Sequence, residues 1–341
     1  MQPIPLSLMT LYADLVQSMD IGAAVSVSTK VITGIRYLYA SEREGMVWKQ
    51  RLVGREGDPE AEAEAARVRS ANSQNRQRQT TVRALKAMGL PGPSIQLGRV
   101  MQAVADAGLF KRGIVLVGTG AYTTYAPLVG AFLPAQAMMT GDADLSVAKL
   151  AATTDTAGEG LLSVLRNADK SFAPVRENDD SASPHRFTAD DKFMVEVLTP
   201  PRRGKGLRTV PVPALGCSAV PLPFMDFLIE DSVETVALYR GGVQVRVPAP
   251  ERYAVHKLII AQRRDKRSAK KPKDLMQAKA LIEALHVSDP GAIEAALSAA
   301  RAKGKAWRET IAKSIGALWP DTLEGAAWLS LSSDSREIVE K

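Results

Sequence analysis

The segment Gly113-Ile-Val-Leu-Val117, which continues as Gly118-Thr119-Gly120, indicates the class of fold. Its apolar run predicts a buried strand, its two later glycines predict a turn, and residues 121–132 predict a helix. A second strand is predicted over residues 142–147, where polar and apolar residues alternate. A strand, turn, helix and strand in this order predict an α/β core.

The residues before this core predict helices and one β-hairpin. Apolar residues recur at helical spacing near the start of the chain, and two runs rich in β-branched and aromatic residues follow. A segment rich in Ala, Glu, Arg and Gln then predicts an exposed helix. The predicted elements are a helix over Leu6–Val16, a hairpin of Val25–Tyr39 and Met46–Val53 that turns at Ser41–Gly45, and helices over Glu56–Met88 and Ile95–Ala107.

After the second core strand, the sequence predicts a long polar loop, one more strand, a second hairpin and a helical end. These are the loop Arg166–Lys192, the strand Phe193–Leu198, the hairpin of Thr235–Tyr239 and Val243–Val247, and helices beyond Pro250. The predicted divisions are an N-terminal helix and β-hairpin module (1–55), a helical connector (56–92), the core (93–249) and a helical C-terminal region (250–341).

The composition of the 341-residue chain is that of an ordinary globular protein, with 45% hydrophobic and 24% charged residues. A single cysteine, Cys217, excludes an internal disulfide, and three histidines are too few for a zinc-type cluster. Any metal is therefore expected to be held by carboxylates. No apolar run approaches the roughly 20 residues that cross a bilayer, and the N-terminus lacks the basic start of a secretory signal. We therefore expect a cytoplasmic protein with no membrane partner.

Asp142 and Asp144 form the first candidate site. Because side chains alternate along a strand, both carboxylates are expected on one face, about 6 to 7 Å apart. This arrangement suits a divalent cation, which would relieve the repulsion between the two charges. An Asp-x-Asp tripeptide arises about once by chance in a chain of this composition, so the motif alone leaves a structural role open.

The Gly118-Thr119-Gly120 turn and Glu196 are the next candidates. Backbone amides at a turn that opens a helix favour a phosphate, and a tight strand-to-helix turn is the alternative interpretation. The turn is neither a P-loop nor a dinucleotide-binding motif, because no Gly-Lys-Ser/Thr follows and Thr123 replaces the third glycine. Glu196 is the one acid in its apolar strand, where it faces either a site or solvent.

Gly118-Thr119, a following helix, Asp142-x-Asp144 on a strand and a later acid at Glu196 together resemble the layout of DNA polymerase β-like nucleotidyltransferases. The chain is similar, more narrowly, to bacterial nucleotidyltransferase-fold proteins related to AbiEii-type toxins. This second resemblance covers three segments, residues 117–147, 193–200 and 248–285. It implies an α/β nucleotidyltransferase core in which Asp142, Asp144 and Glu196 hold magnesium, with manganese as the alternative ion.

The resemblance also implies which residues bind a nucleoside triphosphate. Lys257 lies in Tyr253-Ala-Val-His-Lys257, which resembles the helix whose lysine approaches a phosphate, and Lys273-Asp274 resembles a Lys-Asp pair of the AbiEii-like branch. Asp274 would then be catalytic, as a base. The expected nucleotide-binding residues are Gly118, Thr119, Gly120, Lys257, Arg264 and Lys273. AbiEii-type toxins carry a lysine after the glycine turn, where this chain has Tyr and Thr.

The chemistry of the residues after Pro250 is consistent with these roles. Lys257 and Arg264 are seven residues apart on a predicted helix, so they share a face that triphosphate oxygens can contact, although solvated cations are the commoner arrangement. His256 is expected to be structural. Asp274 also lies close after Pro272, where a carboxylate stabilises a helix N-terminus.

Two basic stretches indicate a polyanionic partner, in keeping with the net charge of +7. One contains Arg202, Arg203, Lys205 and Arg208, and residues 263–274 hold seven Lys or Arg against two Asp. Phosphate contacts from such stretches dominate nucleic-acid affinity, but a charge run is also typical of a solvated face. RNA contact through these basic loops is therefore a hypothesis.

The function predicted from the sequence is magnesium-dependent transfer of a nucleotidyl group from a nucleoside triphosphate to a hydroxyl on RNA, such as a tRNA, or on a protein. One alternative is a non-catalytic nucleotide- or partner-binding protein of a toxin–antitoxin or phage-defence system, which the missing lysine after the turn favours. A basic nucleic-acid-binding module without a nucleotide site is a third interpretation, and it leaves the three acids unexplained.

Overall fold

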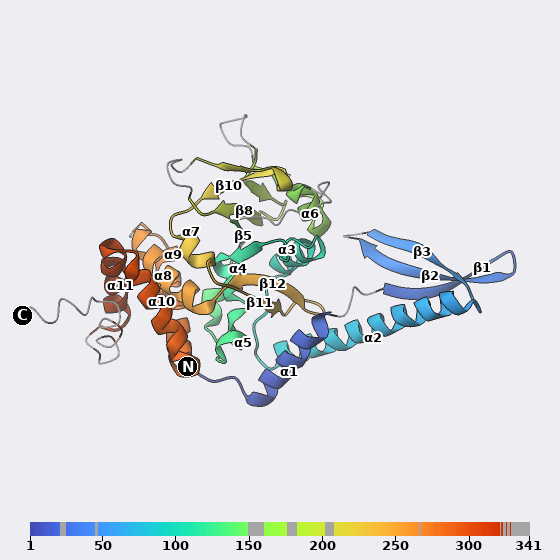
Figure 1. Ribbon diagram of the computed structural model, residues 1–341, viewed down its shortest axis with the longest axis horizontal. Helices are drawn as coiled ribbons and strands as arrows, with labels where there is room; N and C mark the ends of the chain where they lie inside the picture. The colour runs from blue at the N-terminus through green and yellow to red at the C-terminus, as the bar shows by residue number, and fades with distance from the viewer. Residues whose placement is uncertain are drawn as a thin grey trace, which may run out of the picture.

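The computed structural model describes residues 1–20, 25–44, 47–148, 160–175, 183–201, 208–265 and 267–320, together with residues 322, 325 and 328. A mixed α/β core lies in the middle of the molecule, a helical region lies at one end, and an arm of three strands and one long helix projects at the other (Figure 1). The predicted α/β core, N-terminal β module and helical C-terminal region are therefore confirmed.

In the described part of the chain, a seven-stranded mixed sheet forms the centre of the core. Its strands are β4 (Ile114–Val117), β5 (Asp142–Val147), β6 (Ala173–Pro174), β7 (Arg186–Thr188), β8 (Met194–Thr199), β9 (Val210–Val212) and β10 (Cys217–Pro221). The main path is β4-β5-β8-β10-β9, and β7 pairs with both β8 and β6. The neighbours β5 and β8 are parallel, as are β8 and β10, whereas the other pairs are antiparallel.

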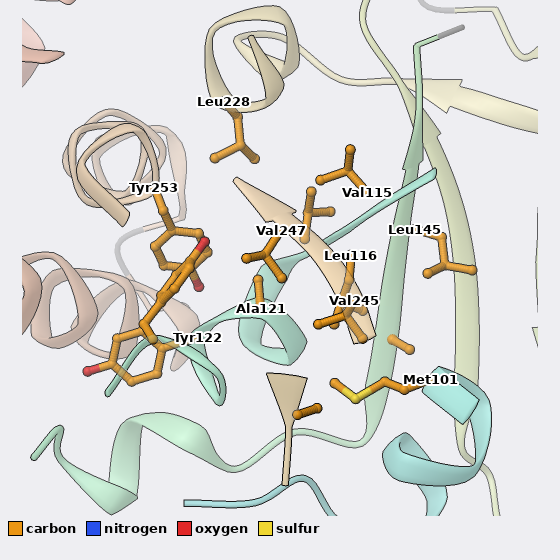
Figure 2. Packing of buried hydrophobic residues seen from close by; sticks show 14 of the residues in the cluster. Met101, Val115, Leu116, Ala121, Tyr122, Leu145, Leu228, Val245, Val247 and Tyr253 are labelled. Carbon is orange, nitrogen blue, oxygen red and sulfur yellow. The ribbon is translucent and has the colours of Figure 1, made fainter. Parts of the chain in front are cut away.

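A second, two-stranded sheet and several short helices pack around this centre. The hairpin of β11 (Ser232–Ala237) and β12 (Val243–Pro248) has the predicted form. Figure 2 shows Val245 and Val247 of β12 beside β4, within the same buried cluster as Val115 and Leu116. The helices of this region are α3 (Ile95–Asp106), α4 (Gly118–Tyr122), α5 (Tyr125–Val129), α6 (Leu161–Ala168) and α7 (Met225–Ile229).

Four further helices form the C-terminal region, and the first of them is almost wholly buried. They are α8 (Pro250–Arg263), α9 (Lys270–Ser288), α10 (Pro290–Ala302) and α11 (Lys305–Leu318). Pro250 occupies the first turn of α8, where its missing N–H has no intrahelical partner to lose. The Tyr253 ring stacks on Tyr122 with the centroids 6.1 Å apart and meets Tyr125 edge-on at 5.1 Å. These contacts tie α8 to α4 and α5, next to β4.

The N-terminal segment divides between the core and the arm. The helix α1 (Leu6–Gln17) packs on the core, where the Tyr12 hydroxyl lies 2.8 Å from Oγ1 of Thr235. The arm consists of β1 (Val25–Ile32), β2 (Ile35–Glu44), β3 (Val47–Arg55) and α2 (Pro59–Ala87). A small separate cluster of Leu38, Ala61 and Ala65 joins the three-stranded sheet to α2. With 29 residues, α2 is about 44 Å long, which carries the sheet away from the core.

The structure corrects three predictions of local structure. The predicted strand Val25–Tyr39 is broken at Thr33-Gly34, whose φ values of 48° and 80° form a tight hairpin turn, so three strands replace the predicted two. The helix predicted over residues 121–132 begins at Gly118 and is interrupted after Tyr122. The predicted loop 166–192 contains the end of α6 and the strands β6 and β7. Single 3₁₀ turns occur at Ser18–Asp20, Ala135–Met138 and Pro213–Leu215.

The predicted division into four segments stays a prediction, although α1 belongs to the main buried cluster while the β1–β3 sheet has its own. No helix among the described residues combines the length and the apolar character that a bilayer crossing requires.

Candidate functional site

Three neighbouring strands bring the predicted acids to one face of the central sheet. Asp144 of β5 lies opposite Val117 of β4 on one side and opposite Glu196 of β8 on the other. Paired residues on adjacent strands point to the same face, and the strands are about 4.8 Å apart. Asp142, two residues before Asp144, shares that face. The structure therefore places Asp142, Asp144 and Glu196 together, as the sequence predicts.

Gly118 follows β4 directly and lies against the Asp144 side chain. A Cβ atom at position 118 would stand 2.2 Å from Oδ2 of Asp144, and the φ of Gly118 is +62°. Any larger residue would displace the carboxylate and strain the backbone, so both observations require glycine here. The predicted phosphate-contacting turn is thus packed against Asp144.

The surroundings of Asp144 raise its pKa to about 6. Burial is the largest cause, and the negative charges of Asp142 and Glu196 add to it, while Lys257 and Lys270 act in the opposite direction. The protein therefore destabilises the charged form of the Asp144 carboxyl. A divalent cation beside it would offset that cost.

The two other acids have cationic neighbours. Nε of Arg186 on β7 lies 2.9 Å from Oε1 of Glu196, and Nζ of Lys270 on α9 lies 3.9 Å from Oδ2 of Asp142. The Thr140 hydroxyl also donates a hydrogen bond to Asp142. Both cationic side chains are exposed, at 43% for Arg186 and 65% for Lys270, so water screens these ion pairs and each contributes little to stability.

The donor chemistry of this face fits magnesium or manganese, which prefer hard oxygen ligands. No three His, Cys, Asp or Glu side chains in the described part of the chain are grouped as they would be around a metal ion. Glu196 is instead bound to Arg186 and Asp142 lies beside Lys270. The acids therefore share a face without converging on one point, and metal binding by Asp142, Asp144 and Glu196 stays a prediction.

Asp274 of α9 is buried in a triad of charges with α8. Nζ of Lys257 lies 2.5 Å from Oδ1 of Asp274, and Nε of Arg264 lies 3.0 Å from Oδ2. Lys257 and Asp274 are only 5% and 3% exposed, so this pair is shielded from water. Burial lowers the pKa of Lys257, and the charges of Asp274 and Asp144 oppose that shift.

The contacts within this triad limit the roles that are predicted for its three residues. Lys257 lies on α8, but the helix ends at Arg263 and Arg264 follows it with an extended backbone. Both side chains bind Asp274 in the structure. Asp274 accepts from both cations, so a role as a base requires it to give up one of them. The prediction that the Asp274 carboxylate stabilises the first turn of a helix is wrong. The helix α9 begins at Lys270, so Asp274 lies in its second turn. The roles of these three residues with a nucleotide stay predictions.

A hydrogen-bond path connects α8 and α9 to the acidic face. The Tyr253 hydroxyl lies 2.9 Å from the Gly118 carbonyl oxygen and 3.0 Å from Oε1 of Gln277, and its hydrogen is shared between these acceptors. Nε2 of Gln277 donates to the Ala137 carbonyl at 2.7 Å, shortly before β5 begins. The path holds the Gly118 turn and the approach to Asp142 against the same two helices.

The remaining predicted nucleotide-binding residues differ in exposure. Thr119 is buried, and a Cβ atom at Gly120 would stand 3.1 Å from Cδ1 of Leu116, so a larger residue there would press on the Leu116 side chain. Nζ of Lys273 donates to the Met139 carbonyl at 2.7 Å, and burial lowers its pKa. His256 is buried, and burial lowers its pKa to about 3, which keeps it neutral. Nucleotide contacts by Thr119, Gly120 and Lys273 stay predictions.

The two basic stretches are only partly described. Residues 202–207 and Lys266 lie outside the described residues, and Arg208 is exposed. In the second stretch, Arg264 binds Asp274 and Lys271 lies 3.4 Å from Oε1 of Gln262. RNA contact through these loops stays a prediction.

Three neighbours of the acids are not predicted from the sequence as parts of the site. Arg186 lies in the predicted loop, and only the register of β7 against β8 places it opposite Glu196. The basic run contains Lys270 but does not indicate that it lies near Asp142. Gln277 can be placed beside Asp274 from the sequence, because it lies three residues later and therefore on the same helix face.

The family of the chain follows from a match over its central region. Residues 96–302 match the family described as nucleotidyltransferase, and the match spans more than half of the chain. The chain belongs to this nucleotidyltransferase family. The relation to AbiEii-type toxins stays a prediction.

Two further comparisons were made. No curated protein matches the sequence. Among solved structures, an antigenic nucleotidyltransferase-like protein from Paracoccidioides brasiliensis is similar, with a TM-score of 0.34 and 16% sequence identity over 65% of this chain and 94% of that chain.

Proposed function

We propose that the protein transfers a nucleotidyl group from a nucleoside triphosphate to a hydroxyl of an RNA, with magnesium held by Asp142, Asp144 and Glu196. The observation that supports this most directly is the pairing of Asp144 with Glu196 across β5 and β8, with Gly118 packed against Asp144. Membership of the nucleotidyltransferase family supports the class of reaction. The identities of the metal, the nucleotide and the acceptor are part of what we propose.

The residues of the site suit the demands of nucleotidyl transfer. This reaction needs neutralised charge and an in-line approach of the attacking hydroxyl more than covalent chemistry by the protein. Magnesium, when bound, would supply positive charge to the phosphate oxygens. Asp142 and Asp144 are on the strand face that would hold it, and the absence of a side chain at Gly118 makes room for the Asp144 carboxylate. Lys270 and Lys273 add positive charge at the same edge for the triphosphate.

Label transfer tests this proposal. The protein is incubated with each α-labelled nucleoside triphosphate and total RNA, in magnesium, in manganese and in EDTA. We expect the wild type to label RNA in the presence of metal, and Asp142→Asn and Asp144→Asn to lose this activity at least tenfold. Asp14→Asn removes an exposed carboxylate from α1 and serves as the matched control, with activity unchanged. Thermal unfolding of each variant shows that it is folded.

Two results would contradict the proposal. The first is that the wild type labels RNA no better than Asp142→Asn and Asp144→Asn. The second is transfer that is the same in EDTA as in magnesium. Label found on a protein in place of RNA, when lysate is supplied, would change the acceptor and leave the site assignment in place.

One observation favours a non-catalytic alternative, a nucleotide- or partner-binding protein of a toxin–antitoxin or phage-defence system. Arg186 and Lys270 already lie against Glu196 and Asp142, in positions where they reduce the need for a metal. The helix after the turn also presents Tyr122 and Thr123 where AbiEii-type toxins carry a lysine. Nucleotide binding without transfer, in the same assay, would favour this alternative.

A further inference from the structure

The sheet of the arm has two faces of different character. The inner face packs on α2 through Leu38, Ala61 and Ala65. Cross-strand pairing places Lys30, Tyr37 and Arg55 in one row of the other face, and Tyr39 and Leu52 in the next. We call this second face, with Gln50, the outer face. It projects with α2 from the end of the molecule opposite the C-terminal helices (Figure 1).

The outer face combines two aromatic rings with unpaired positive charge. Tyr37 and Tyr39 are half-buried and point to the same side, about 6 to 7 Å apart along β2. Nζ of Lys30 lies 4.9 Å from the centre of the Tyr39 ring. Lys30, Arg55 and Leu52 are exposed, and no side chain of the outer face that the structure describes is acidic.

The acids of the arm lie elsewhere and neutralise other arginines. Residues 25–87 contain twelve Lys or Arg against seven Asp or Glu, a net charge of +5. Five of the seven acids fall between residues 56 and 64, and three of these five bind arginines outside the outer face. The ion pairs are Arg36–Glu56, Arg51–Glu64, Arg67–Glu64 and Arg69–Glu62. Lys30 and Arg55 are paired with no acid among the described residues, so the excess positive charge is available on the outer face.

Aromatic rings on an open sheet, beside cations that no acid neutralises, are the arrangement on which proteins stack the bases of a single strand while binding its phosphates. We propose that the outer face binds single-stranded RNA, with bases stacked on Tyr37 and Tyr39 and phosphates bound by Lys30 and Arg55. Gln50 accepts a hydrogen bond from Nζ of Lys30 and so holds this cation on the outer face. The identity of the strand as RNA rests on the proposed function, whereas the stacking surface does not.

Binding to labelled oligonucleotides tests this proposal. The full-length protein is titrated into a fluorescently labelled, unstructured single-stranded RNA in EDTA without nucleotide, and anisotropy is measured at several salt concentrations. DNA of the same sequence and a double-stranded RNA are the comparison probes. We expect the single-stranded RNA to bind most tightly, with an affinity that falls steeply as salt rises.

Two sets of variants separate stacking from charge. Tyr37→Leu and Tyr39→Leu keep an apolar residue on the strand and are each expected to weaken binding about 5- to 150-fold, the range of measured base-stacking effects. Arg55→Ala is expected to lower the slope of log K against log salt by about 0.7, the value for one phosphate contact on a single strand. Arg67→Ala, an equally exposed arginine on α2, is the matched control and is expected to bind as the wild type does.

Four results would overturn the proposal: no binding of single-stranded RNA, unchanged binding by both tyrosine variants, equal losses in Arg55→Ala and Arg67→Ala, or equal affinity for DNA. A dimer that the tyrosine variants dissociate would assign the outer face to a second copy of the chain, which also overturns it.

Asp144→Asn distinguishes this proposal from the proposed function, because it is expected to bind RNA normally while failing to transfer label. If the tyrosine variants transfer label normally and still bind RNA, the stacking proposal fails and the proposed function is unaffected.

Discussion

Replacing Asp144 with asparagine is expected to stabilise the folded protein at pH 8 when no divalent metal is present. The pKa of this carboxyl is raised from 3.8 to about 6, first by burial and then by the charges of Asp142 and Glu196. Each pKa unit corresponds to about 1.4 kcal/mol, so the charged form costs up to about 3 kcal/mol in the folded state. Because the side chain is partly exposed, water screens some of this cost, and we expect a gain of about 1 to 3 kcal/mol.

The stability difference between the two proteins should depend on pH in one direction. Below about pH 4, Asp144 is protonated in both the folded and the unfolded chain, so the cost is absent. As the pH rises toward about 6, the unfolded chain releases this proton while the folded chain keeps it, and the stability of the wild type falls relative to that of the variant. Above about pH 6 both states are ionised and the wild type carries the full cost. The advantage of Asp144→Asn therefore grows between these values and is constant above them.

Urea denaturation and calorimetry of both proteins in EDTA, at several pH values from 4 to 8, measure this difference. For a chain of this size, each kcal/mol corresponds to about 2 °C in the unfolding midpoint. Added magnesium should stabilise the wild type and leave Asp144→Asn nearly unchanged, because only the folded wild type offers the paired carboxylates. An asparagine variant that is less stable than the wild type at pH 8, or an advantage that is the same at every pH, would show that the charged Asp144 carries no such cost. Asp14→Asn should show neither effect.

Three further substitutions test the contacts around the acids, each by urea unfolding. Gly118→Ala is expected to cost about 1 to 3 kcal/mol, because alanine must adopt a left-handed φ against a carboxylate, and an unchanged midpoint would show that no clash occurs. Asp274→Ala leaves Lys257 buried without its counter-charge and is expected to lower the free energy of unfolding by about 3 to 5 kcal/mol. Arg264→Ala keeps the buried pair and should lower it by less. Equal losses in the two variants would contradict this account. Tyr253→Phe keeps the ring packing but removes its hydroxyl, which should cost about 1 kcal/mol and speed amide exchange at the Gly118 turn, and unchanged exchange there would argue against the hydrogen-bond path.

Much of the fold and the centre of the site follow from local sequence patterns. The apolar run before Gly118 and the alternation around Asp142 and Asp144 predict two strands, and both are present. The hairpin around Gly241-Gly242 and the helical character of the region beyond Pro250 follow from turn residues and helical periodicity in the same way. The single acid in the apolar strand around Glu196 is predicted as a candidate, because an ionised group there needs a partner or solvent.

The predictions from the sequence fail where one local pattern is compatible with two different structures. The run from Val25 to Tyr39 has the composition of one strand, and Thr33-Gly34 adopts a turn because the positive φ values at these two residues match the twist of the strands on either side. The helix that starts at Gly118 is interrupted within a short distance, because Thr123 and Thr124 donate their hydroxyls to carbonyls of the preceding turn and compete with its continuation.

Local sequence patterns are sufficient to specify the α/β class and the strand that holds Asp142 and Asp144. These features depend on periodicity within a few residues, which the order of side chains specifies directly. Tertiary packing specifies the contacts of Lys257 and Arg264 with Asp274 and of Arg186 with Glu196, and it leaves the described outer face of the arm without an acid. Each of these depends on which distant residues meet across strands and helices, and strand register and helix packing set those meetings.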